Sequence, residues 1–387
     1  MRIGLITTIG TNIGDTLIRE GICLVLKEVF GGRDLEFVLV NKHAPLTVYP
    51  DGHPVRAAVL ARYLPRGRAR AASAIERLAS KLNMSRFDGC DLIVQCGTPV
   101  LWPGCHRCEW AVPIWHHVVG RLSERIPVLN IAAGACYPWE RQPSEVTDPR
   151  DIEYLRAITS YCRTTTVRDR LAHRLFQAMD IEAPLVPCSA LLAAGRNPTA
   201  NGGDGTVLID YMHGGGHYDW DQRIDPSAWA RTMRNLIERL KHRHNLVFLC
   251  HDEKEYGLAK DLDPTLRRMW PKDPQEYFDL VATASGAICN RMHASVALAS
   301  LGIPSIAVCT DTRLLMVEAL GLPCLYVKEA TADRLEDLLE HLLARRAQEK
   351  ARLLALRTET WNRYVEVFSR AMDEKEPARH DLCSVSV

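Results

Sequence analysis

Short apolar runs alternate with longer segments of helical periodicity along almost the whole chain. In the first half, apolar runs of strand length lie at 2–7, 35–40, 90–95, 126–131, 165–167 and 183–189. A helical pattern begins near Asp15, and its apolar face includes Ile18, Ile22 and Val25. Parallel strands need crossover connections and are buried on both faces. The alternation therefore predicts parallel sheets covered by helices.

The pattern stops and restarts around Asn201–Gly205, a run of small and polar residues. Beyond it, apolar runs at 206–211, 246–250, 287–290 and 305–308 alternate with helical segments near 226–243, 274–284, 291–301 and 312–320. Residues 332–372 have the pattern of a long helical segment. A chain of 387 residues exceeds what one hydrophobic core usually supports.

We therefore predict an α/β fold with two Rossmann-like parallel-sheet domains that face each other across a cleft. The predicted domains are 1–195 and 203–345, followed by a long C-terminal helix and tail at 346–387. The first domain is assigned to the acceptor and the second to the anionic donor.

Composition bears on the partners and the cellular location of the protein more than on the reaction it catalyses. The net charge of +1 creates no overall attraction to nucleic acid or membranes, so electrostatic recognition has to come from local clusters. No stretch is long and apolar enough for a signal peptide or a transmembrane segment. The thirteen cysteines lie scattered through apparent strands and helices, which favours reduced thiols. We expect a soluble cytoplasmic enzyme without a nucleic-acid partner.

Ligands in such sheets bind beyond the carboxyl ends of the strands, next to helix N-termini. After the first strand, Asn12, Gly14 and Asp15 offer hydrogen-bonding groups and a close backbone approach. The alternative is that Asp15 only caps its helix. In the second half, Asn290 is expected to cap the helix that follows.

This cap would place Arg291 and His293 in the first helical turn, facing the cleft. An arginine beside a helix N-terminus suits a carboxylate or phosphate, and the helix dipole keeps the imidazole neutral. Arg168, in the first half, also follows a strand and is placed to face Arg291. The alternatives are a surface arginine with a buried histidine, and an ion pair between Arg168 and Asp169.

Other motifs carry weaker signals. Cys105 and Cys108 have metal-ligand spacing, but a clear second pair is missing, so we expect no metal. His213 opens a glycine loop, His213–His217, that is expected to lie near the cleft. A basic stretch from Arg62 to Arg70 is more typical of a solvated loop than of a binding site.

Four motifs in the order found here resemble the polysaccharide pyruvyl transferase family. They are Asn12–Asp15, Asp91–Val94 with its glycine turn, Val167–Asp169, and Asn290–His293 leading to Ala299–Pro304. The resemblance spans about residues 3 to 322, and the last motif is the most specific. It implies a fold similar to the GT-B glycosyltransferases. It also implies transfer of an enolpyruvyl-derived group from phosphoenolpyruvate to a sugar hydroxyl, forming a ketal.

The resemblance also implies roles for individual residues. Arg168 and Arg291 would hold the phosphate or carboxylate of the donor, and His293 would be the acid/base group. The acceptor would be a sugar or glycoconjugate in cell-surface polysaccharide (exopolysaccharide) synthesis, and no cofactor would be needed beyond phosphoenolpyruvate as donor substrate. The further substrate-binding candidates are Asn12, Gly14, Asp15, Gly97, Thr98, His213, Asp311 and Arg313.

One turn departs from the family pattern. Where family members usually carry a run of glycines, this chain has Cys96–Pro99. The acceptor therefore stays open, as do the stereochemistry of the ketal and the oligomeric state. Two other functions remain open: a GT-B-type glycosyltransferase that uses a nucleotide sugar, and a non-catalytic sugar-binding relative. A nucleotide site would need a carboxylate and a stacking ring, for which Glu318 and Trp270 are the candidates.

Overall fold

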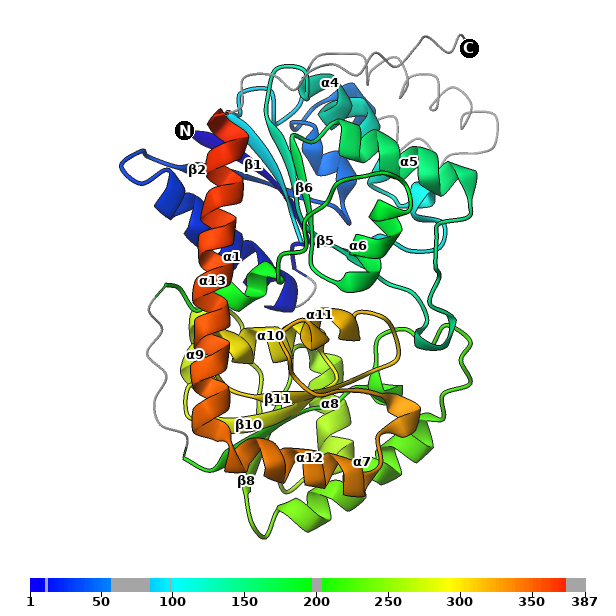
Figure 1. Ribbon diagram of the computed structural model, residues 1–387, viewed down its shortest axis with the longest axis vertical. Coiled ribbons are helices and arrows are strands. Elements are labelled where there is room, and N and C mark those ends of the chain that lie inside the picture. Colours follow the sequence, from blue (N-terminus) through cyan, green and yellow to red (C-terminus); the bar gives the residue numbers. More distant parts are fainter. Residues whose placement is uncertain (11–12, 57–83, 98, 197–203, 374–387) are drawn as a thin grey trace.

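Two six-stranded parallel sheets, each with helices on both faces, form the molecule (Figure 1). The computed structural model describes residues 1–10, 13–56, 84–97, 99–196 and 204–373. The first sheet has the order β2-β1-β3-β5-β4, with β6 paired to β5. Its strands are β1 (Arg2–Thr7), β2 (Glu36–Asn41), β3 (Leu92–Cys96), β4 (Pro99–Leu101), β5 (Val128–Ala135) and β6 (Thr164–Val167).

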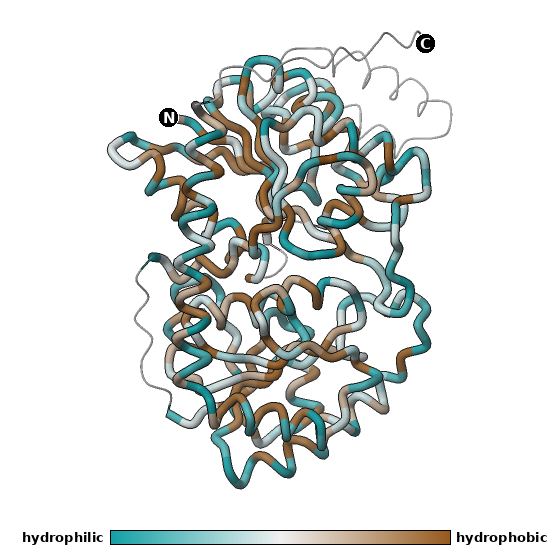
Figure 2. Tube along the Cα trace, in the orientation of Figure 1, coloured by the Kyte–Doolittle hydropathy of each residue, from teal (hydrophilic) through white to brown (hydrophobic). Residues whose placement is uncertain are grey.

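The second sheet has the order β12-β11-β10-β7-β8-β9. Its strands are β7 (Thr206–Asp210), β8 (Asn245–Leu249), β9 (Arg267–Met269), β10 (Ala284–Cys289), β11 (Ser305–Cys309) and β12 (Cys324–Tyr326). Most of these strands are short runs of buried apolar residues, as expected where helices cover both faces (Figure 2). We call the parts built on these sheets the N-terminal and C-terminal domains.

The helices of the N-terminal domain are α1 (Ile13–Val29), α4 (Gly120–Leu122), α5 (Pro149–Ser160) and α6 (Arg170–Gln177). Short 3₁₀ turns are η1 (Pro45–Val48), η3 (Cys105–Arg107), η5 (Trp139–Arg141) and η6 (Ser189–Leu192), and η4 (Ala111–Val119) is a π-helix. The C-terminal domain holds η7 (His213–Gly215), α7 (Pro226–Leu240), α8 (Glu253–Leu262), α9 (Pro274–Val281), α10 (Met292–Ser300), α11 (Leu314–Glu318), η8 (Val327–Glu329) and α12 (Ala332–Ala344). Several helices begin at a capping aspartate, such as Asp148, Asp225 and Asp252.

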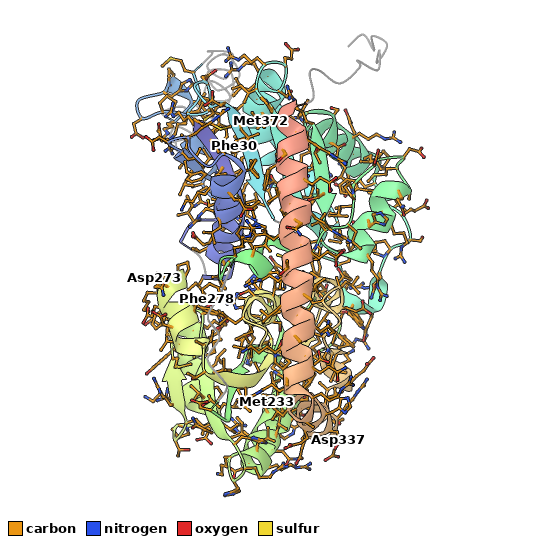
Figure 3. The ribbon with its side chains drawn as sticks, turned by 60° about the vertical axis from the view of Figure 1, so that its left-hand side comes forward. Phe30, Met233, Asp273, Phe278, Asp337 and Met372 are labelled. Atoms are coloured by element: carbon orange, nitrogen blue, oxygen red, sulfur yellow. The ribbon has the colours of Figure 1, made fainter. Side chains whose placement is uncertain are left out.

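The last described helix, α13 (Arg346–Asp373), joins the two domains (Figure 3). It contacts α1 and η6 on one side and α10 and α12 on the other. Trp361 and Tyr364 of α13 are buried in one apolar cluster that also contains Leu17 of α1 and Val296 of α10. The Tyr364 hydroxyl donates a 2.8 Å hydrogen bond to the carbonyl of Pro187. The two domains therefore share one hydrophobic core along this seam.

The predicted fold class is confirmed: two parallel-sheet α/β domains and a long C-terminal helix. The strand predicted at 183–189 is wrong, because these residues make only one bridge, between Val167 and Leu185, before η6. The helical segment predicted at 332–372 is confirmed as α12 and α13, and α13 begins at Arg346, where the C-terminal helix was predicted to start. The predicted boundary between the domains, residues 196–202, lies outside the described residues except for residue 196.

Within the described part of the chain, no helix has the length and apolar character that crossing a membrane requires.

Candidate functional site

A cavity of about 530 Å³ lies between the carboxyl ends of the two sheets. Residues that follow β2, β6, β7, β10 and β11 all reach it. Its lining is Asp15, Lys42, His43, Trp102, Trp110, Cys136, Arg168, Met212, His217, Tyr218, Trp220, Asn290, Arg291, Met292, His293, Arg313 and Met316. Four of these side chains are lysine or arginine and only one is a carboxylate. The cavity therefore favours a negatively charged ligand.

Arg168 is the cation best prepared for an anion. It directly follows β6, and only 1% of the residue is exposed. Its Nη1 donates to the carbonyl of Gly97 at 3.3 Å and to Nε2 of His293 at 3.2 Å. Its Nη2 is buried and has no hydrogen-bond partner among the described residues. A buried guanidinium that lacks a partner for one nitrogen is costly, and an oxyanion would supply that partner.

The alternative considered for Arg168, an ion pair with Asp169, is not what holds these residues. The Asp169 carboxylate instead accepts hydrogen bonds from the backbone N–H groups of Ala135, at 2.9 Å, and Ala172, at 2.8 Å. It thereby caps α6. Arg168 is left with a carbonyl, a thiol and an imidazole as its described contacts.

An irregularity in β5 makes room for this guanidinium. The pairing register of β5 with β6 shifts between Asn130 and Ala133, and Ala132 there has a φ of 53°. The N–H of Ala132 donates to Oγ1 of Thr166 at 2.8 Å. A Cβ on Gly134 would lie 2.6 Å from Nε of Arg168. Glycine at this position therefore lets the guanidinium lie directly against the strand.

His293 is neutral in this site. Removal of water around the ring, followed by the charges of Arg168, Arg313, Arg291 and Lys42, lowers its pKa well below the usual 6.5. An arginine can only donate hydrogen bonds, so Nε2 of His293 is the acceptor of the bond from Arg168. The proton of the neutral ring is therefore on Nδ1.

The prediction that Asn290 caps α10 is wrong. Arg291 is the residue at the N-cap position, and no side chain makes a capping hydrogen bond there. The Asn290 amide instead joins the segment after β7 to α7 and β11. Its Oδ1 accepts from the N–H of Met212 at 2.8 Å and from Nε1 of Trp229 at 3.3 Å, and its Nδ2 donates to the carbonyl of Val308 at 2.9 Å.

Arg291 lines the cavity but is already paired. Its Nε donates to Glu255 at 2.5 Å and its Nη2 to Asp252 at 2.7 Å, while its backbone N–H donates to Asp210 at 2.6 Å. His251 lies among these groups, with its Nδ1 3.1 Å from Glu255 and 3.7 Å from Asp210. This cluster fixes Arg291 at the start of α10 and offsets its charge.

The groups that hold Arg291 differ in how readily they give up a proton. Burial raises the pKa of Asp210 to about 7. Burial opposes ionisation of Glu255 as well, but the hydrogen bond and charge of His251 lower its pKa to about 2. The pKa of His251 is raised by the two carboxylates, against the effect of burial. Glu255 and His251 therefore form an ion pair beside Arg291.

Arg313 is held by a fully buried carboxylate. Its Nε and Nη2 donate to the two oxygens of Asp311 at 2.8 and 2.6 Å. The guanidinium also lies 5.1 Å from the ring centroid of Tyr218. Asp311 therefore acts on a ligand only through Arg313, because both of its oxygens are taken by this pair.

Aromatic rings line the cavity from both domains. Trp102 and Trp110 of the N-terminal domain lie with ring centroids 5.6 Å apart. Tyr218 and Trp220 of the C-terminal domain lie 5.4 Å apart. Trp220 has a φ of 56°, which is rare for a bulky residue and is typical of loops held for function. Such rings suit the apolar faces of a sugar ring.

Metal binding has two candidate positions among the described residues. The groups are His106, Asp148 and Asp151, and the buried set Asp210, His251 and Glu255. In each, the histidine Nδ1 already makes a hydrogen bond with a carboxylate. The Cys105–Cys108 pair belongs to neither group, and burial raises the pKa of both thiols, that of Cys108 to about 11. The absence of a metal stays a prediction.

The structure brings together Asp15, Arg168, Arg291, His293 and Arg313 from the predicted set. The other predicted residues are placed differently. Gly14 is buried in the first turn of α1, and Gly97 contributes its carbonyl to Arg168. His213 is exposed in η7, while His217, at the other end of the same loop, lines the cavity. Asn12 and Thr98 lie outside the described residues.

Sequence reasoning missed Lys42, His43 and the tryptophans and tyrosine of the cavity walls. Lys42 directly follows β2, so its place at a strand end was the available signal. The two residues proposed for a nucleotide lie elsewhere. Glu318 pairs with Arg170 at 3.1 Å, Trp270 packs against Tyr256, and neither lines the cavity.

Comparisons with known proteins agree with this architecture. The family model described as polysaccharide pyruvyl transferase matches residues 12–311. Comparison with curated protein sequences gives no match. Among solved structures, the UDP-GlcNAc 2-epimerase from Neisseria meningitidis bound to UDP-GlcNAc is 10% identical with a TM-score of 0.53, and covers 96% of this chain and 100% of its own.

A second epimerase structure gives the same result. The UDP-GlcNAc 2-epimerase from Methanocaldococcus jannaschii, in complex with UDP-GlcNAc and UDP, is 14% identical with a TM-score of 0.51, and covers 96% of this chain and 100% of its own. The glycosyltransferase SnogD from Streptomyces nogalater is 14% identical, with a TM-score of 0.48 over 96% and 99% of the two chains. The likeness to the two epimerases, at these identities, shows a GT-B-like fold alone.

Proposed function

This chain belongs to the polysaccharide pyruvyl transferase family, and we propose that it transfers an enolpyruvyl-derived group from phosphoenolpyruvate to a sugar hydroxyl. The observation that carries the proposal is Arg168. Its guanidinium is buried at the cavity, touches His293, and has one nitrogen without a described partner. A phosphate or carboxylate of the donor is the chemical group that would complete this site.

The cations divide between the two walls of the cavity. Arg168 belongs to the N-terminal domain, and Arg291 and Arg313 to the C-terminal domain. In phosphoenolpyruvate the phosphate and the carboxylate are both attached to C2, so one donor molecule can contact the cations of both walls. The same positive charges would stabilise the phosphate as it leaves.

His293 fits the proton transfers of this reaction. Protonation of the methylene carbon makes C2 oxocarbenium-like, and a sugar hydroxyl bonds to C2 as it loses its proton. The proton lost by that hydroxyl balances the proton gained by the methylene carbon. Phosphate then leaves, and a second hydroxyl bonds to C2 and closes the ketal. The proton that this hydroxyl loses goes to the departing phosphate, which is released as hydrogen phosphate. The pKa of His293 is low in the empty site, and the donor anion would raise it. The protonated imidazole can then give a proton to the methylene carbon and take back the proton that the hydroxyl loses.

The acceptor would bind between the aromatic walls. Trp102 and Trp110 on one side, and Tyr218 and Trp220 on the other, offer ring faces beside the cations. This combination of stacking surface and charge fits a sugar of a cell-surface polysaccharide or related glycoconjugate. No metal or cofactor is required by the proposed steps.

Calorimetric titration of phosphoenolpyruvate tests the proposal, with UDP as the competing ligand class. The wild type should bind phosphoenolpyruvate saturably, and Arg168→Met should weaken binding about tenfold or more, because a charge-assisted hydrogen-bonding group is lost. Arg231→Met, at an exposed arginine on α7, should leave binding unchanged. Tight binding of UDP with no signal from phosphoenolpyruvate would overturn the proposal in favour of a nucleotide-sugar enzyme.

A further inference from the structure

Resting on the proposed function, we propose that Lys42 is a ligand of the donor: its ammonium group and Arg168 together hold one oxyanion of phosphoenolpyruvate. Lys42 directly follows β2 and lines the same cavity as Arg168 and His293. It belongs to none of the motifs that the family resemblance rests on. Its site is therefore assigned here from geometry and charge.

The Lys42 side chain is held in place before any ligand arrives. Only 6% of the residue is exposed, and its Nζ lies 5.2 Å from the ring centroid of Trp110. His43 meets the same indole edge-on, with centroids 5.4 Å apart. A lysine fixed in this way loses little side-chain entropy when it binds an anion.

The charged groups that act on Lys42 come from several separate segments of the chain. Asp15 of α1 favours its protonated form, as do Cys108 and Glu109 before the π-helix. Arg168, after β6, acts against protonation, and His293 on α10 feels the charge of Lys42 in turn. Glu109 also pairs with His43, whose Nδ1 lies 2.7 Å from its carboxylate.

Lys42 and Arg168 are therefore two like charges held near each other beside the cavity. Their mutual repulsion is relieved when an oxyanion lies between them. Burial, the larger effect, lowers the pKa of Lys42 to about 8 in the empty site. An arriving donor anion favours the protonated amine, so it raises that pKa and draws a proton from solvent.

This linkage gives a test that needs no acceptor. Phosphoenolpyruvate is titrated into the full chain by calorimetry between pH 6.5 and pH 10, in buffers of differing ionisation enthalpy. For the wild type, affinity should fall above about pH 8, approaching tenfold per pH unit, with proton uptake on binding. Lys42→Arg keeps a charge that does not titrate in this range, so affinity should stay level and the uptake above pH 8 should vanish.

Lys42→Met should weaken binding at pH 7 about tenfold or more and abolish the same uptake. Lys272→Met is the matched control, because Lys272 also lies over a tryptophan, Trp270, but away from the cavity. It should behave as the wild type. Inorganic phosphate and pyruvate, titrated separately, show which end of the donor Lys42 holds.

The outcomes separate this inference from the proposed function. If phosphoenolpyruvate binds, but Lys42→Met and Lys42→Arg keep wild-type affinity and pH dependence, Lys42 is no donor ligand. If phosphoenolpyruvate fails to bind the wild type, the proposed function falls and this assignment falls with it. Should Lys42→Met not fold, as judged by circular dichroism, the pH profile of Lys42→Arg decides the question.

Discussion

Nη1 of Arg168 lies 3.2 Å from Nε2 of His293, and this contact constrains both side chains. The arginine charge helps to keep the imidazole neutral, and the imidazole occupies Nη1 of the arginine. A donor anion on Nη2 would oppose the cations around the ring and so raise the pKa of His293. His293 would then change from a base to an acid as the donor binds.

Proton uptake on the acidic side tests this change. The pKa of free His293 lies well below 6.5 and should rise on donor binding, so phosphoenolpyruvate should draw in protons when the pH lies between the two values. Calorimetry near pH 6 in buffers of differing ionisation enthalpy measures the number of protons taken up on binding. His293→Asn should remove the uptake near pH 6 and leave that above pH 8. Equal uptake in the variant and the wild type would contradict the role given to His293.

Strand β5 shows how one element shapes the site. Its bulge at Ala132 and the missing side chain at Gly134 open the space that the Arg168 guanidinium fills. Both features interrupt a strand whose residues are otherwise ordinary buried positions. The irregularity in the ladder is therefore tied to the placement of one charged side chain.

Gly134→Ala should impair donor binding without unfolding the protein. The added Cβ would lie 2.6 Å from Nε of Arg168, so the guanidinium has to move away from Gly97 and His293. We expect phosphoenolpyruvate to bind about tenfold or more weakly by calorimetry, with the circular dichroism spectrum retained. Gly257→Ala on α8 has open space around it and serves as the control. Unchanged binding by Gly134→Ala would show that Arg168 is not confined as described.

The elements also show how far sequence reasoning reaches. Strands and helices follow from apolar period, but the run 183–189 misled because Pro184 and Pro187 each lack the N–H that a strand ladder needs. Arg168, Arg291 and His293 were found because Arg168 directly follows β6 and the other two lie within a few residues of the end of β10. Trp102 and Trp110 were missed because they lie in a loop and beside a π-helix, where periodicity carries no signal.

At the scale of the whole molecule, α13 makes the two domains depend on each other. Trp361 is 4% exposed within the shared core, and its Nε1 donates to Glu28 of α1 at 2.9 Å. Farther back along the helix, Arg357 donates to the carbonyl of Ser300, at the end of α10, at 3.2 Å. Each domain thus borrows part of its core and its hydrogen bonds from the same helix.

Trp361→Ala should destabilise the whole chain in one step. Removing a large buried aromatic side chain typically costs about 3–5 kcal/mol. Denaturant unfolding followed by circular dichroism and by tryptophan fluorescence should give coincident transitions for the wild type, shifted together in the variant. Arg363→Ala, at a half-exposed position of the same helix, should change stability by less than about 0.5 kcal/mol. Two separated transitions in the wild type would mean that the shared core does not couple the domains.

The position of α13 also governs the order in which the protein is assembled. Ribosomes add residues from the amino end, so both sheets emerge before the helix that completes their common core. Until then, the inward faces of α1 and α10 carry apolar side chains that α13 will later cover. A nascent chain of this protein therefore passes through a stage that is prone to aggregation and suited to chaperone binding.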